Sequence, residues 1–134
     1  MNKMVGLSIA GPRGGKVKEE EVLFNFTNEC IDILGLDLYK FELDIFVSNK
    51  FERDFADAVG CCYGDTESVV VELARRDWND EKSDMLTTLA HEMIHVWQCV
   101  KGERFKENPA RKHEAFLTEL VMARLDLELW SINK

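Results

Sequence analysis

The chain has 134 residues, of which 46% are hydrophobic and 31% are charged, and its formal net charge is −8. This length suits one domain over residues 1–134 with a real hydrophobic core, and no apolar run reaches the roughly 18 residues that a membrane span needs. The acidic balance repels phosphate backbones, so strong nucleic-acid binding by this chain alone is not expected.

The N-terminal half is predicted to contain a strand, a helix and three further strands. The apolar residues before "GPRGGK" suggest a short first strand, and that stretch is a turn because it lacks the Ser or Thr that a phosphate-binding loop requires after its lysine. From about Lys18 to Leu34 the apolar residues recur at helical spacing, and Gly35 can end the helix. The stretches "KFELDIFVS", "DAVGCCYGD" and "ESVVVELA" each have the composition of a strand.

The C-terminal half is predicted to be mostly helical. One helix covers "NDEKSDMLTTLAHEMIHVWQCVKG" and ends near Lys101 and Gly102. After the loop "GERFKE", a last helix is expected to start with Asn108 as N-cap and Pro109 at its first position. This order of elements predicts an α+β domain with a small three- to four-stranded sheet packed against helices.

The four cysteines are predicted to be reduced thiols. They lie at Cys30, Cys61, Cys62 and Cys99, so no C-x-x-C pair is available for a zinc ribbon, and a bond between the two adjacent cysteines would be strained. A chain of this size does not need disulfides for stability. Free thiols favour a cytoplasmic location.

The chemistry of the chain is concentrated in "LAHEMIHVWQ", residues 89–98. Residues four apart on a helix share one face, so His91 and His95 can bind the same metal ion. Glu92 projects about 100° away and is placed to take a proton from a water that the metal activates, as in H-E-x-x-H zinc sites. The alternative is an amphipathic helix whose two histidines are incidental, although this motif arises by chance in only roughly one random arrangement in two hundred.

A catalytic zinc needs a third protein ligand, and the last helix offers two candidates. His113 is ranked first, because Phe116, Leu117, Leu120 and Leu127 all lie within about 60° of it and would place it on the apolar face, pointing into the domain. A core histidine making one hydrogen bond is the alternative interpretation. Glu114, at the margin of that face, is ranked second and could instead orient a ligand histidine. Glu119 points elsewhere and is discounted.

"TLAHEMIHVWQ" followed by a downstream histidine resembles the SprT-like zinc metalloprotease family, over about residues 58–120. The resemblance implies a zincin-like core, with Zn²⁺ held by His91, His95 and His113 and with Glu92 as the general base. It also implies a polypeptide substrate bound as an extended strand along an edge strand, here "ESVVVEL". The chain departs from the family in having Glu114, not glycine, after the third histidine, and no cysteine after Cys99 for a C-terminal zinc ribbon.

The sequence therefore predicts a zinc metallopeptidase of the HExxH type. Tyr63 and Arg104 are candidates for the electrophile that stabilises the oxyanion. The alternative is a catalytically silent zinc-binding interaction module of the same fold, against which the intact Glu92 argues, because a structural site needs no base. A third possibility is an acidic adaptor without metal, which the metal content of the protein would distinguish.

Overall fold

A computed structural model describes residues 5–11, 20–48, 60–74, 82–104 and 106–125 of the chain. Its strands are β1 (Val5–Ala10), β2 (Phe41–Ser48), β3 (Gly60–Gly64) and β4 (Ser68–Ala74). Its helices are α1 (Glu20–Ile33), α2 (Lys82–Val100) and α3 (Glu107–Leu125), with a short 3₁₀ turn η2 (Leu36–Leu38) after α1. The predicted α+β class, with a small four-stranded sheet, is confirmed, and so is the predicted order of the strands and main helices along the chain.

The sheet has the strand order β1-β2-β4-β3. The pairs β1–β2 and β2–β4 are parallel, whereas β3 and β4 form an antiparallel hairpin. The prediction that "ESVVVEL" forms an edge strand is wrong, because β4 bonds β2 on one side and β3 on the other. Strand β3 lies at the end of the sheet instead.

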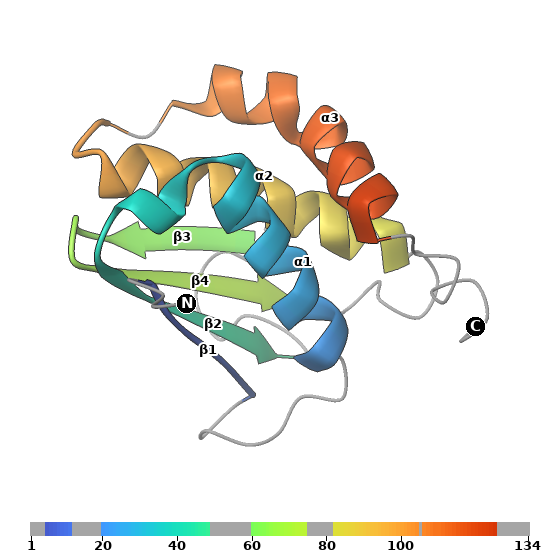
Figure 1. Cartoon of the computed structure of the whole chain (residues 1–134), viewed down its shortest axis with the longest axis horizontal. Coiled ribbons are helices and arrows are strands. Elements are labelled where there is room, and N and C mark those ends of the chain that lie inside the picture. Colours follow the sequence, from blue (N-terminus) through green and yellow to red (C-terminus); the bar gives the residue numbers. More distant parts are fainter. Residues whose placement is uncertain (1–4, 12–19, 49–59, 75–81, 105, 126–134) are drawn as a thin grey trace.

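One face of the sheet is covered by helices, as Figure 1 shows. The residues that point to this face from the two central strands are fully buried: Leu43, Ile45, Val47, Val69, Val71 and Leu73. Helix α2 packs along β3 and β4, while α3 packs on α1 and α2 as an outer layer. Among the described residues, no helix is long and apolar enough to cross a membrane.

Helix α2 is held against the sheet by an apolar stripe. Leu86, Leu89, Ala90 and Met93 are all fully buried, as the sequence predicts, and Val100 continues the stripe at the end of the helix. Because these side chains fix the rotation of α2, the neighbouring positions 91 and 95 are turned toward α3. Packing of an ordinary amphipathic helix therefore determines where the two histidines point.

The connection between α2 and α3 is short and reverses the chain. Gly102 has a φ of 77°, which favours glycine, and its N–H donates to the carbonyl of Cys99 at 3.0 Å. Helix α3 then begins at Glu107, so the prediction of Asn108 as N-cap is wrong. Pro109 remains compatible with the first turn, where the backbone N–H groups have no partner within the helix. The earlier start places Glu107 at the positive end of α3.

Candidate metal centre

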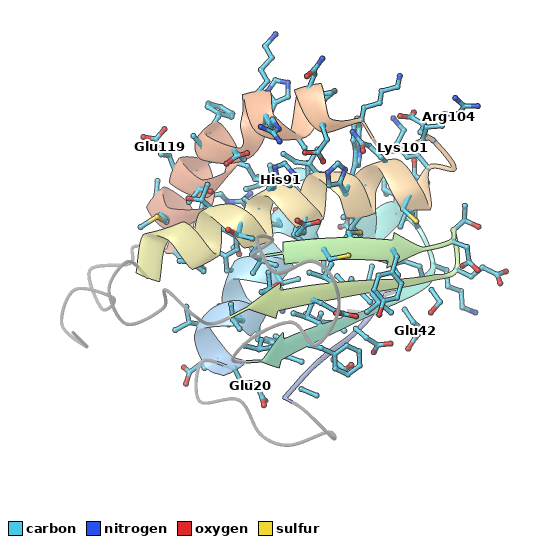
Figure 2. The ribbon with its side chains drawn as sticks, turned by 180° about the vertical axis from the view of Figure 1, so that it is seen from behind. Glu20, Glu42, His91, Lys101, Arg104 and Glu119 are labelled. Atoms are coloured by element: carbon cyan, nitrogen blue, oxygen red, sulfur yellow. The ribbon has the colours of Figure 1, made fainter. Side chains whose placement is uncertain are left out.

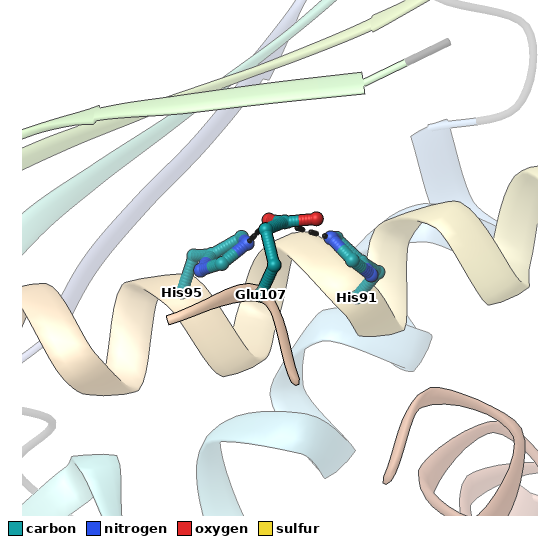
Figure 3. A group of neighbouring side chains, drawn as sticks. All are labelled: His91, His95 and Glu107. Atoms are coloured by element: carbon teal, nitrogen blue, oxygen red, sulfur yellow. Dashed lines mark hydrogen bonds and ion pairs between the residues drawn. The ribbon is translucent and has the colours of Figure 1, made fainter. Parts of the chain in front are cut away.

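His91 and His95 lie one turn apart on α2 and face the start of α3 (Figure 3). Their ring centroids are 4.9 Å apart and the ring planes are inclined by 76°. The His95 side chain is 5% exposed, and that of His91 is 17% exposed. The pair therefore lies where the core meets the surface, which allows a bound ion to be reached from solvent.

The carboxylate of Glu107 lies between the two imidazoles (Figure 3). Its Oε1 atom is 3.3 Å from Nε2 of His91 and 2.5 Å from Nε2 of His95. Its Oε2 atom accepts a hydrogen bond from Nε of Arg111 at 3.4 Å. In the described part of the chain, His91, His95 and Glu107 form the group that could hold a metal ion, with one ligand atom from each lying within 4.8 Å of the others.

The other nitrogen of each imidazole faces an oxygen acceptor. Nδ1 of His91 is 2.9 Å from Oε1 of Glu114, and Nδ1 of His95 is 2.9 Å from Oε1 of Gln98. A carboxylate or carboxamide oxygen can only accept, so both Nδ1 atoms carry the proton. In the neutral imidazoles, the Nε2 atoms that face Glu107 are then unprotonated and present lone pairs.

This donor set has the ligand types of a tetrahedral zinc site. Ligand atoms at about 2.0–2.2 Å from zinc lie about 3.3 Å from one another in a tetrahedron. The separation between His91 and Glu107 already has that value, at 3.3 Å, and the 2.5 Å separation between His95 and Glu107 would have to lengthen by about 0.8 Å. The Glu107 side chain is 55% exposed, so it is not held in place by surrounding core residues.

Glu92 points from α2 toward the edge strand β3. It is 6% exposed, and a β-carbon built on Gly60 would lie 2.9 Å from Oε2 of Glu92, so the carboxylate rests directly against the backbone of that glycine. Burial raises the pKa of Glu92 to about 7; the two histidines oppose this shift, whereas Glu107 and Glu114 add to it. A carboxylate with a pKa near neutrality is suited to accept and return a proton at physiological pH.

The histidines and the carboxylates around them shift one another's pKa values. Burial alone would lower the pKa of His91, but the hydrogen bond to Glu114 and the nearby Glu92 and Glu107 raise it overall. Burial acts to raise the pKa of Glu107, but its hydrogen bond to His95 and the charge of His91 lower it overall. Positive charge is therefore favoured on His91 and negative charge on Glu107, which lies between the two imidazoles.

The raised pKa of Glu92 predicts a pH-dependent difference in the stability of metal-free protein. Because folding raises this pKa from 4.5 to about 7, the contribution of Glu92 to stability is full below about pH 4.5 and is lost as the pH rises toward 7. Glu92→Gln stays neutral, so at about pH 8 the metal-free variant should be about 1–3 kcal/mol more stable than the wild type. Denaturant unfolding of both chelated proteins measures this difference, which should shrink toward pH 5. A wild type that is the more stable protein at pH 8 would contradict the environment described for Glu92.

His113 lies on the exposed side of α3, so the prediction that it points into the domain is wrong. The buried residues of α3 are Ala110, Leu117, Thr118 and Val121, whereas Phe116, on which the prediction depended, is 66% exposed. The buried face is thus turned about 100° from the predicted one and includes the half-buried Glu114. The structure does not bring His113 to the histidine pair.

Glu114 instead meets the pair, but through Nδ1 of His91 and not through the nitrogen that faces Glu107. It therefore orients His91, which is the second role predicted for it. Glu119 is exposed and lies away from the centre (Figure 2), as expected. The sequence does not predict a role for Glu107, because "GERFKE" has the composition of a loop. Its signal is the six-residue connection 101–106, which reverses the chain and brings the first residue of α3 beside a histidine five positions before the end of α2.

Neither candidate electrophile is near the histidines. The hydroxyl of Tyr63 donates to Oε2 of Glu72 on the neighbouring strand, and its side chain alternates with the buried Cys62, so it lies on the sheet face opposite the helices. Arg104 is exposed in the α2–α3 connection and points outward, well away from His91 (Figure 2). The position of neither residue supports the predicted role of stabilising an oxyanion beside the histidines.

The cysteines do not form a second reactive centre. None of the four forms a disulfide bond in the structure. Burial raises the pKa of Cys30, Cys62 and Cys99, so these side chains remain protonated and poorly nucleophilic at neutral pH. The candidate metal ligands of the described residues are therefore histidines and a glutamate, not cysteines.

Comparisons of the chain with models of known protein families, with curated proteins and with solved structures found no match. The interpretation of the centre therefore rests on its own residues.

Proposed function

We propose that this chain is a zinc-dependent peptidase. In this proposal His91, His95 and Glu107 hold the metal, Glu92 acts as the general base, and Glu114 orients His91. The proposal keeps the predicted histidine pair and base, and replaces His113 by Glu107 as the third ligand.

The observation that carries this proposal is that Nε2 of His91 and Nε2 of His95 both face the same oxygen of Glu107. Both Nδ1 atoms are occupied as donors to Glu114 and Gln98, and both Nε2 atoms lie within 3.3 Å of the same oxygen of Glu107. Two neutral imidazole lone pairs and a carboxylate oxygen repel one another unless a positive charge lies among them. A divalent cation supplies that charge without requiring both histidines to be protonated.

The ligand types favour zinc over the harder cations. Two imidazoles and one carboxylate form the ligand set of several catalytic zinc sites, whereas magnesium and calcium prefer sites built entirely of oxygen ligands. Three protein ligands leave one coordination position for water or substrate. In addition, hydrogen bonds from both Nδ1 atoms to oxygen acceptors are the usual support for zinc-binding histidines.

A zinc ion held there would supply Lewis acidity, lowering the pKa of a water molecule toward about 7 and polarising a substrate carbonyl. Glu92 would accept the proton of the attacking water and pass it to the departing amine. Burial raises the pKa of Glu92 in the metal-free protein, and a carboxylate with a raised pKa takes up a proton more readily. Exclusion of bulk water from Glu92, which is 6% exposed, also keeps this proton at the site.

A polypeptide substrate is supported by the position of β3. This strand is at the end of the sheet order, and α2 packs along it. An extended chain that adds to its outer edge would obtain main-chain hydrogen bonds independent of its side chains. Since Gly60 of β3 touches Glu92, such a chain would pass close to the proposed base.

Gly60→Ala is expected to lower hydrolysis by about 10–100-fold while zinc remains bound. The added β-carbon would lie 2.6 Å from Cγ2 of Thr88 and 2.9 Å from Oε2 of Glu92, so the carboxylate must move away from its position. Initial rates and zinc content of the purified variant measure the two effects. Cys61→Ala is the matched control, because the side chain at 61 leaves the strand on the opposite face and should affect neither quantity. Full activity of Gly60→Ala would separate Glu92 from the reaction.

Peptide hydrolysis tests the proposed activity. Zinc-loaded protein is incubated with a library of unstructured peptides, and newly formed N-termini are identified by mass spectrometry. The expected result is a set of new termini that is absent after chelation and returns when zinc is restored. Stoichiometric zinc without any cleavage would contradict the peptidase and leave the alternative of a zinc-binding interaction module.

A further inference from the structure

Gln98 is a buried polar residue at the end of α2 that contacts two parts of the centre at once. It is 2% exposed, and Oε1 of its carboxamide is 2.9 Å from Nδ1 of His95, one turn earlier on the helix. The same carboxamide also pairs with the backbone of Lys106, the residue directly before Glu107. No step of the proposed reaction uses this side chain.

The pairing with Lys106 fixes which end of the carboxamide is oxygen. The N–H of Lys106 donates to Oε1 at 3.0 Å, and Nε2 of Gln98 donates to the carbonyl of Lys106 at 3.2 Å. Exchanging the two ends would place a donor against a donor and an acceptor against an acceptor. The oxygen must therefore face His95.

The orientation of the carboxamide in turn selects the tautomer of the neutral His95 ring. Because Oε1 only accepts, Nδ1 of His95 must be the donor, and Nε2 of the neutral ring is left with its lone pair toward Glu107. The main chain of Gln98 holds the connection as well, since its carbonyl accepts the N–H of Glu103 at 2.8 Å. Gln98 thus forms hydrogen bonds with Glu103, with Lys106 and with the imidazole of His95.

We propose that Gln98 is a positioning residue: it sets the tautomer of His95 and anchors the segment that presents Glu107, so that both groups face one point. The inference rests on the proposed metal centre. It extends that proposal by coupling the two halves of the ligand set, which come from different helices, through a single side chain. His91 is oriented separately by Glu114 and is therefore an internal reference.

The tautomers of the metal-free protein test this role without any metal or activity. Long-range nitrogen–proton NMR spectra, recorded above about pH 8.5, where imidazoles are ordinarily neutral, distinguish protonated Nδ1 from protonated Nε2. The wild type is expected to show the Nδ1–H form for both histidines. In Gln98→Met, which keeps the length of the side chain and removes both polar ends, His95 should lose this preference while His91 keeps it. Gln98→Glu keeps an acceptor toward Nδ1 and should retain it.

Zinc affinity gives the second readout, measured by competition with a chromophoric chelator. Gln98→Met is expected to weaken zinc binding by about 10–100-fold, and Gln98→Glu by much less. A wild-type His95 in the Nε2–H form, or equal zinc affinity in Gln98→Met and the wild type, would overturn the positioning role. A wild type that shows the expected tautomers but binds no zinc would overturn the metal centre and not the action of Gln98 on His95.

Discussion

Substitution of Glu92 by glutamine is expected to lower peptide hydrolysis by about 10²–10⁴-fold while the zinc content stays at one ion per chain. Glutamine has nearly the same shape as glutamate and fits the buried space against Gly60, but it cannot accept a proton from water. Because Glu92 is not in the group of residues that could hold the ion, its replacement removes no ligand and should leave the zinc stoichiometry unchanged. Initial rates on one cleaved peptide, together with elemental analysis of the same preparation, separate the two effects.

Glu119→Gln is the matched control for this variant. It removes the same charge from an exposed carboxylate on α3 that lies away from the centre, so its rate and zinc content should equal those of the wild type (Figure 2). If Glu92→Gln retained its full rate with zinc bound, Glu92 would not be the base. If Glu92→Gln lost its zinc, the assignment of Glu92 as the base and not as a metal ligand would be wrong.

The second large effect concerns the third ligand. Glu107→Ala is expected to weaken zinc binding by at least about 100-fold, because it removes the oxygen on which both Nε2 atoms converge. His113→Ala should leave the affinity unchanged, since His113 is exposed on another side of α3. Glu114→Ala should have an intermediate effect, about tenfold, because it acts through Nδ1 of His91. Competition with a chelator gives all three dissociation constants on one scale.

These variants distinguish the observed arrangement from the one that the SprT-like resemblance implies. Loss of zinc from His113→Ala, with Glu107→Ala unaffected, would support three histidine ligands and would require a different rotation of α3. Comparable loss from both variants would contradict either assignment of a single third ligand. The structure predicts that Glu107→Ala weakens zinc binding far more than His113→Ala does.

The parts of this protein that the sequence predicted well depend on local patterns. The apolar stripe of α2 and the position of Gly35, whose φ is 71°, follow from helix periodicity and from the conformational preference of glycine. The same periodicity brought His91 and His95 to one face, because the geometry of a helix fixes the relation between residues four apart. Each of these conclusions needs only a few neighbouring residues.

The rotation of α3 could not be predicted in this way. Its exposed face carries Phe116, and its buried face includes Thr118, whose hydroxyl donates to the carbonyl of Glu114 at 2.7 Å. Ranking positions by hydrophobicity therefore turned the helix by about one residue and selected His113 in place of Glu114. Packing against α1 and α2, including the ion pairs of Arg124 with Glu29 and Asp32, determines the observed rotation.

The order of the strands was also beyond local reasoning. The run of β-branched residues in β4 has the composition of a strand inside a sheet, whereas the family resemblance implies an edge strand there. Strand β3, with the sequence GCCYG, gives a weak strand signal and ends at Gly64, whose φ of 142° suits the turn of the hairpin. Which strand lies outermost depends on pairings between residues far apart in the chain.

Zinc content is the most direct test of the cation site on which the proposed chemistry depends. Protein purified without any exposure to chelators is analysed for transition metals by mass spectrometry, beside a variant carrying both His91→Ala and His95→Ala. The expected result is about one zinc ion per wild-type chain and essentially none in the double variant. Wild-type protein without stoichiometric metal, or a double variant that still binds one zinc ion per chain, would contradict it.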